Sequence, residues 1–202
     1  MATLNISHFV TYLSFYREYL KLYKKHLTVR YTKLDDELIL IPVLSHITIE
    51  SLISHSLRFA ISNLAYNNLP LRKISTIFQG DGLNKKIELL KSLYFVEPPI
   101  FKFLESYIKK SSFLRNKIIH GHEMSYMYSN DGIYKESPLF KEMKLFDFDK
   151  HFKEFSEFID KFLDTLLEIP KNDLAPAVDW DKTFVENNRN YFKKLKKDIL
   201  KK

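Results

Sequence analysis

The hydrophobic positions of this chain recur at intervals of three and four residues over most of its length, which is the spacing of amphipathic helices. In the first such segment, at about 6–26, one side is formed by Phe9, Val10, Leu13, Tyr16, Leu20 and Tyr23. A second and more uniformly apolar segment follows Asp35 and Asp36, acidic residues that can cap a first helical turn. The pattern therefore predicts two long helices in the first third of the chain.

Three further helical segments follow an interruption that contains glycine and proline. The first is short and covers about 83–95. The second begins after Pro98 and Pro99, which a helix tolerates in its first turn, and stops at Gly121, because glycine readily takes the conformation that closes a helix. The third covers about 149–169 and has one aromatic face. We therefore expect an all-α fold, a bundle of about five helices.

Two further features are predicted in addition to the five-helix bundle. Tyrosines and small polar residues alternate around Asn130-Asp131-Gly132, which predicts a small β-hairpin inserted after the fourth helix. The proline-containing stretch after residue 169 is typical of a linker, and a basic helix is expected from about Thr183 to the end. The predicted domains are a helical domain over residues 1–169 and a linker with a basic C-terminal helix or tail over residues 170–202.

The composition agrees with one helical core. The chain has 202 residues, of which 45% are hydrophobic, and contains only 4 glycines and 7 prolines. It has no cysteine, which excludes disulfides, thiolate metal sites and a thiol nucleophile. The N-terminal stretch lacks the pattern of a signal sequence, and the longest uninterrupted apolar run, 38–44, is too short to cross a bilayer. These observations predict a soluble, cytoplasmic protein with no membrane partner.

The net charge of +7 is concentrated near the C-terminus. Aromatic and aliphatic residues there alternate with Lys193, Lys194, Lys196 and Lys197. Such a segment can bind RNA phosphates, lie on a membrane surface or form a solvated or docked terminal helix. The four lysines are therefore candidate RNA contacts, and the three alternatives stay open at this point.

The stretch LRNKIIHGHE, residues 114–123, carries the most specific chemistry. Histidine can accept and donate a proton near neutral pH, and the arginine fork matches phosphate oxygens and stabilises charge that builds on a phosphate. Arg115 and His120 would therefore suffice for metal-free RNA cleavage with the neighbouring 2′-hydroxyl as nucleophile. Five residues on a helix rotate by about 140°, so this pair shares no face, whereas Asn116 and His120 do. The alternative is a surface arginine and a histidine that neutralises the helix dipole.

The segment FLRNKIIHG, residues 113–121, resembles the signature of the HEPN (higher eukaryotes and prokaryotes nucleotide-binding) superfamily, in which an arginine, a polar residue and a histidine lie near the end of a late helix. The motif positions are Arg115, Asn116 and His120. The resemblance implies a HEPN-like bundle and a metal-independent endoribonuclease without cofactors, in which two motif helices of a homodimer form one cleft. Arg115 would contact the scissile phosphate, His120 would act as acid or base, and Asn116 would orient or bind.

The same resemblance implies a toxin or an abortive-infection effector in phage defence, with an antitoxin or defence-system partner. Members that pair with a nucleotidyltransferase antitoxin often have a tyrosine where this chain has His122, so regulation by tyrosine modification is not expected. His122 is either a second proton-transfer group or an exposed loop residue. Lys117, inside the motif, is a candidate RNA contact.

A polar line is predicted on the otherwise apolar second helix, where His46, Glu50 and Ser54 recur every four residues. Glu50 is predicted to hold the Arg115 guanidinium, because a buried carboxylate needs a charged partner. No third ligand completes a metal site, so none is predicted. Two other functions remain possible: a catalytically inactive module that binds RNA, nucleotide or protein, and a helical adaptor in which the motif is coincidence.

Overall fold

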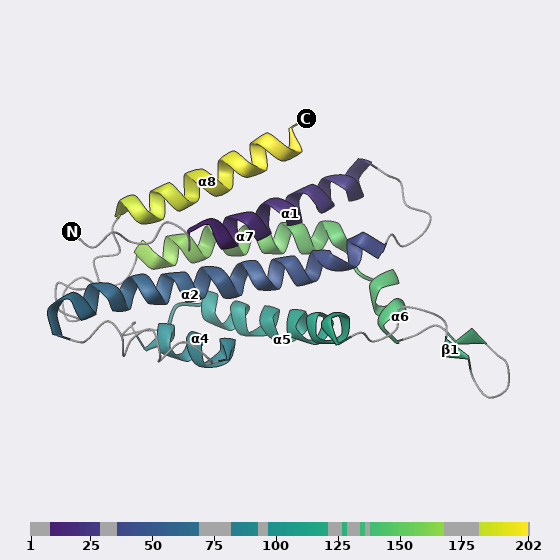
Figure 1. Ribbon diagram of the computed structural model, residues 1–202, viewed down its shortest axis with the longest axis horizontal. Coiled ribbons are helices and arrows are strands. Elements are labelled where there is room, and N and C mark those ends of the chain that lie inside the picture. Colours follow the sequence, from purple (N-terminus) through teal and green to yellow (C-terminus); the bar gives the residue numbers. More distant parts are fainter. Residues whose placement is uncertain are drawn as a thin grey trace.

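The computed structural model describes residues 9–28, 36–68, 82–92, 97–120, 127–128, 134–135, 138–167 and 182–201. The fold is all-α, as predicted, and its long helices run roughly lengthwise beside one another (Figure 1). The helices are α1 (Phe9–Thr28), the 3-10 helix η2 (Asp36–Ile39), α2 (Leu40–Asn68), α4 (Leu83–Lys91), α5 (Ile100–Ile119), α6 (Pro138–Lys144), α7 (Phe148–Leu167) and α8 (Lys182–Leu200).

The central element is α2, which contacts α1 on one side and α4 and α5 on the other. Its buried side chains include Ile41, Ile49, Leu52, Ile53 and Leu57. A helix that is apolar on several sides needs neighbours on several sides, and this position provides them.

By length and composition alone, the stretch Glu37–Leu57 could cross a bilayer, with a mean hydropathy of 1.5. The uninterrupted apolar run 38–44 does not reveal this, because polar side chains divide the longer stretch. In the structure 61% of the stretch is buried in the protein, and its position between α1 and α5 is that of a core helix.

An aromatic cluster joins α1 to α7. Tyr19 of α1 and Phe155 of α7 meet edge to face, with their ring centroids 4.7 Å apart. Tyr23 stacks on Phe152 at 3.9 Å. Offset and edge-to-face contacts of this kind add to the free energy gained by burying the rings. The helix predicted at about 149–169 is confirmed as α7.

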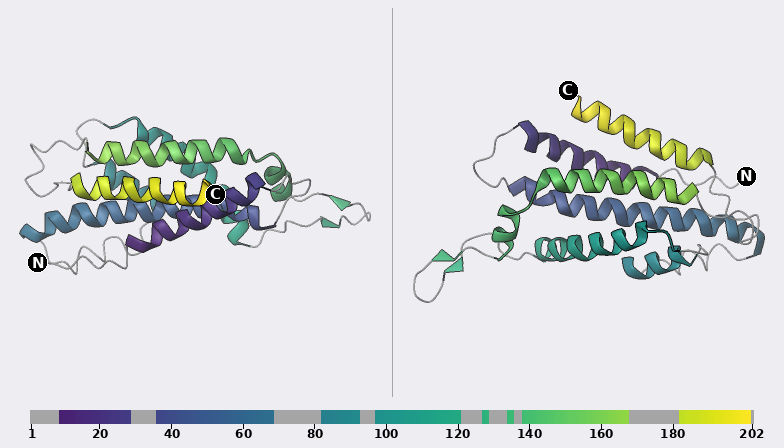
Figure 2. Two further views of the ribbon diagram at one scale, coloured as in Figure 1. Left: turned by 90° about the horizontal axis from the view of Figure 1, so that it is seen from above. Right: turned by 180° about the vertical axis from the view of Figure 1, so that it is seen from behind.

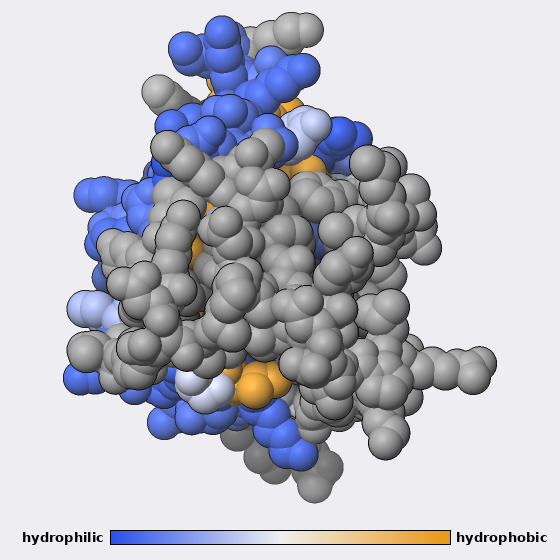
Figure 3. All heavy atoms as spheres, turned by 90° about the vertical axis from the view of Figure 1, so that its left-hand side faces the viewer, coloured by the Kyte–Doolittle hydropathy of each residue, from blue (hydrophilic) through white to orange (hydrophobic). Residues whose placement is uncertain are grey.

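The basic C-terminal segment forms α8, which docks on α1 and α7. Val185, Asn188 and Phe192 are buried, and the Phe192 ring lies 4.8 Å from that of Tyr16. The outer side of α8 is hydrophilic, as the upper part of Figure 3 shows. A docked helix, one of the alternatives for the tail, is therefore what the structure contains. The predicted boundary near residue 170 lies outside the described residues.

Two short strands and one short helix follow α5. β1 (Met127–Tyr128) and β2 (Tyr134–Lys135) pair antiparallel, and they lie beyond one end of the helical bundle (Figure 2). The residues between the strands are outside the described part of the chain. α6 buries Leu139 and Met143 and contacts α5. The spacing of hydrophobic residues does not predict α6, because seven residues are too few to establish a helical period.

Candidate active site on helix α5

The motif lies at the C-terminal end of α5, as predicted. The buried face of α5 packs against α2 and α7 and includes Phe101, Leu104, Ile108 and Leu114. It ends at Ile119, and the backbone N–H of His120 donates to the carbonyl of Asn116 at 3.0 Å. His120 therefore caps the C-terminal end of α5, where the negative end of the helix dipole lies.

The structure joins the side chains of Arg115 and Asn116, and among the described residues no side-chain hydrogen bond links His120 to either of them. Arg115 Nη1 donates to Asn116 Oδ1 at 3.0 Å. Arg115 follows Ile108 and Ser111 at helical spacing, so it lies toward the core and is half-buried, and its Nε has no hydrogen-bond partner among the described residues. Asn116 and His120 are exposed. The angular separation of Arg115 and His120 expected from their spacing is thus retained.

Behind Arg115 lies a buried histidine of α2. His46 Nδ1 is 2.9 Å from Ser111 Oγ, and this hydrogen bond joins α2 to α5 one turn before Arg115. Burial lowers the pKa of His46; the nearby Glu50 carboxylate opposes this shift and the Arg115 guanidinium adds to it. His46 is therefore a neutral group within electrostatic reach of Arg115. The helical spacing of the polar line reveals His46, but not that it faces Ser111.

Glu50 is paired with Lys86 rather than with Arg115, the partner predicted from the sequence. Its Oε1 lies 3.8 Å from Lys86 Nζ of α4, and Lys86 also donates to Ser54 Oγ at 3.0 Å. Among the described residues no hydrogen bond or ion pair joins Glu50 to Arg115. The physical reason is that α4 packs on this part of α2 and brings its own cation to the polar line.

A second buried polar cluster ties three helices together two turns before the motif. The Tyr107 hydroxyl of α5 donates to Ser45 Oγ of α2 at 2.9 Å. His151 Nε2 of α7 lies 3.0 Å from Ser45 Oγ and 3.3 Å from the Tyr107 oxygen. Burial, with a smaller contribution from Lys110, lowers the pKa of His151 to about 4, so the imidazole is neutral at pH 7. The cluster fixes the position of α5 against α2 and α7.

The candidate RNA contacts fall into two groups. Lys117 lies beside the motif, where its Nζ is 3.0 Å from Glu142 Oε1 of α6 and 3.9 Å from the centroid of the Phe113 ring. The other group is on α8, where Lys193, Lys194 and Lys197 are exposed and Lys196 Nζ lies 5.1 Å from the centroid of the Phe152 ring. Figures 1 and 2 show α8 and α5 on opposite sides of the bundle. His122 lies outside the described residues.

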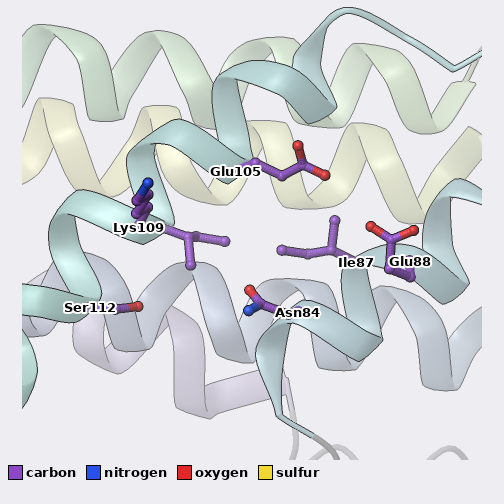
Figure 4. Close-up of a pocket in the computed structure, with 7 residues that line it drawn as sticks. Asn84, Ile87, Glu88, Glu105, Lys109 and Ser112 are labelled. Carbon is purple, nitrogen blue, oxygen red and sulfur yellow. The ribbon is translucent and has the colours of Figure 1, made fainter.

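A pocket of about 610 Å³ opens between α4 and α5 (Figure 4). It is lined by Asn84, Ile87, Glu88, Glu105, Ile108, Lys109 and Ser112. Ser112 is one helical turn from Asn116, so the pocket lies on the flank of α5 next to the motif. Within the part of the chain that the structure describes, no group of three or more histidines and carboxylates is arranged to hold a metal ion.

No protein-family model matches this chain, and no curated protein and no solved structure is significantly similar to it. The candidate site is therefore defined by the chemistry and geometry of its own residues. Its polar groups are Arg115, bonded to Asn116, and His120, exposed at the end of the same helix.

Proposed function

We propose that this chain is a metal-independent endoribonuclease of the HEPN type. The observation that carries the proposal is the end of α5, where an exposed histidine caps the helix and a guanidinium, oriented by Asn116, lies about one and a half turns earlier. These are a proton-transfer group and a phosphate-binding group at the same end of one helix. No other exposed histidine occurs among the described residues.

In the proposed reaction His120 removes the proton from the 2′-hydroxyl of the substrate. The 2′-oxygen attacks the adjacent phosphorus, the bond from phosphorus to the 5′-oxygen breaks, and an imidazolium donates a proton to the leaving oxygen. The products are a 2′,3′-cyclic phosphate and a free 5′-hydroxyl. Arg115 stabilises the negative charge that builds on the phosphate, while Asn116 holds the guanidinium; no metal or other cofactor is required.

The proposed active unit is a homodimer with a HEPN-like bundle in each subunit. Arg115 lies toward the core and His120 on the outer side of α5, so one copy alone does not direct both groups at one phosphate. A second copy across the ends of the two α5 helices supplies the missing half. Ile119, with 51% of its side chain exposed next to His120, provides an apolar contact for such a pairing.

The proposed biological role is that of a toxin or an abortive-infection effector in the cytoplasm. Its substrate is RNA, and an antitoxin or another defence-system protein would control it. This role rests on the resemblance of the motif and on the proposed chemistry.

The test compares wild type with His120→Ala on total RNA in the presence of EDTA. We expect cleavage by wild type that persists with EDTA, fragments ending in a cyclic phosphate, and no cleavage by the variant. Asn116→Ala should also reduce cleavage. Its matched control is Asn190→Ala, at an exposed asparagine of α8, which should leave cleavage unchanged. Equal cleavage by wild type and His120→Ala, or loss of cleavage on chelation, contradicts the proposal.

The second candidate is a catalytically inactive module that binds RNA, nucleotide or protein. It is favoured by the half-buried Arg115, which is bonded to Asn116 rather than directed at His120. Binding of RNA without cleavage identifies this function. A helical adaptor, in which the motif is coincidence, predicts neither binding nor cleavage of RNA.

A further inference from the structure

The solvent-facing side of α5 forms a continuous line of exposed residues that leads to the motif. We call this line the outer ridge; its members are Lys102, Ser106, Lys109, Lys110 and Phe113. At 3.6 residues per turn these positions lie on one side of the helix, and the same line continues to Asn116 and His120. The buried face of α5, which includes Leu104, Ile108 and Ser111, is on the opposite side.

Phe113 is the unusual member of the outer ridge. Half of its side chain, 51%, is exposed, and it is not part of the buried core cluster. Lys117 Nζ lies 3.9 Å from its ring centroid, and the Lys117 ammonium is held by Glu142 at 3.0 Å. The ring is thus oriented by a fixed cation and still presents aromatic surface to solvent. An exposed ring in this state is suited to stacking on another planar group.

The charges of the outer ridge are not neutralised within the described part of the chain. Lys102, Lys109 and Lys110 form no ion pair with any described residue. The one carboxylate of α5, Glu105, is bonded to Lys91 of α4. The outer ridge is therefore a positive surface with an aromatic residue in it, which is the combination that binds single-stranded nucleic acid.

We propose that the outer ridge of α5 binds the RNA substrate as a single strand, with Phe113 stacked on a base and Lys109 and Lys110 contacting phosphates. This inference rests on the proposed function and adds the path by which the substrate reaches the site. Phe113 and His120 are separated by about 10 Å along the helix, a distance that an extended strand spans readily. A duplex keeps its bases stacked on one another, so it offers no free base to the ring.

Two alternatives to RNA binding by the outer ridge are less favourable, the first because of its charges and the second because of its position. Packing the outer ridge against that of a second copy would bring lysines without counter-charges face to face, which is unfavourable. The α8 lysines are equally basic, but α8 lies across the bundle from α5 (Figure 1), the helix that ends at His120, so RNA bound to α8 is not directed to the site.

The first experiment measures binding by fluorescence anisotropy. The probe is a labelled 2′-O-methyl RNA of about twelve nucleotides, which lacks the 2′-hydroxyl nucleophile and cannot be cut. Phe113→Ala should weaken binding roughly 5- to 150-fold, the range expected for one lost base stack. Phe113→Trp should keep the affinity, whereas Phe113→Leu, which keeps apolar bulk without a ring, should behave like Phe113→Ala. Wild-type affinity for Phe113→Leu or Phe113→Ala overturns the stacking role.

The second experiment compares two variants with the same change in charge. Lys109→Gln with Lys110→Gln should reduce the slope of log affinity against log salt by about 1.4, or about 0.7 for each lost phosphate contact. The control, Lys193→Gln with Lys194→Gln, should leave the slope unchanged. An equal or larger effect of the α8 variant overturns the proposed path. If the Phe113→Ala variant changes its oligomeric state and keeps the wild-type affinity for RNA, the outer ridge is a protein interface. This result also overturns the proposed path.

Failure of this inference is distinguishable from failure of the proposed function. If wild type cuts RNA while the outer-ridge variants bind like wild type, the ribonuclease stands and the path is wrong. If the outer ridge binds RNA as described and no RNA is cut, the path stands and the chain is a binding module.

Discussion

His46 of α2 and Ser111 of α5 are joined by a buried hydrogen bond, with 2.9 Å between Nδ1 and Oγ. The Ser111 hydroxyl donates to the Ile108 carbonyl at 3.3 Å, so the imidazole N–H is the donor to Ser111. Arg115 lies one turn beyond Ser111 on the same side of α5. The bond therefore sets the position of the arginine relative to α2.

Removing His46 should cost stability without abolishing the fold. His46→Leu keeps most of the side-chain volume and loses the hydrogen bond, so we expect the free energy of unfolding to fall by about 1–2 kcal/mol. The measurement is urea unfolding of His46→Leu, Ser111→Ala and the double variant. The two substitutions should be non-additive, since each breaks the same bond. Additive effects would show that the two side chains act independently.

The buried His151 predicts a loss of stability at mildly acidic pH. Its pKa is lowered from 6.5 to about 4 in the folded protein, so the unfolded chain takes up the proton first as the pH falls. The stability that the neutral imidazole contributes is therefore full above about pH 6.5 and is lost progressively toward pH 4. By pH 5 the loss should be about 2 kcal/mol.

The check is urea unfolding at several pH values for wild type and His151→Gln. Glutamine can still donate to Ser45 but does not titrate, so the variant should show a shallower decline between pH 7 and pH 5. The difference between the two curves isolates His151 from the carboxylates that titrate in both proteins. Parallel curves would contradict the assignment.

Arg115→Lys should reduce RNA cleavage strongly although the charge is kept. One guanidinium nitrogen bonds Asn116 and others remain for a phosphate, whereas a lysine ammonium is a point charge that lacks this fork. We expect cleavage to fall about 10²- to 10³-fold, the usual effect of losing one stabilising donor. The matched control is Arg189→Lys on α8, where Arg189 pairs with Asp164 and should not affect cleavage. Wild-type cleavage by Arg115→Lys would remove Arg115 from the mechanism.

Ile119→Asp should separate the two proposed subunits. An aspartate at this exposed position adds a charge to each side of the proposed contact, so the dimer should dissociate and cleavage should be lost, with the helical content unchanged. Light scattering measures the dissociation of the dimer, and circular dichroism measures the helical content. Leu27→Asp, at an apolar position of α1 that is also exposed, is the control and should stay dimeric. A monomeric wild type that cleaves RNA would contradict the composite site.

Much of the fold follows from local patterns. The apolar periodicity and the terminal proline and glycine signals predict α5 with its end at the motif, and the stripe of aromatic residues predicts α7. Such signals depend on residues three and four positions apart, which are neighbours in any helix. The short helix α6 carries too little of this signal to be found.

Local patterns in the chain are enough to predict that it is helical, that Arg115 and His120 lie at a helix end, and that the two side chains point in different directions. The pairing of Glu50 with Lys86, the position of His46 behind Arg115 and the position of α8 across the bundle from α5 follow only from the packing of the helices. The difference arises because helix formation is specified by near neighbours in the sequence. Which helices pack together, and hence which charges meet, depends on the burial of side chains far apart in the chain.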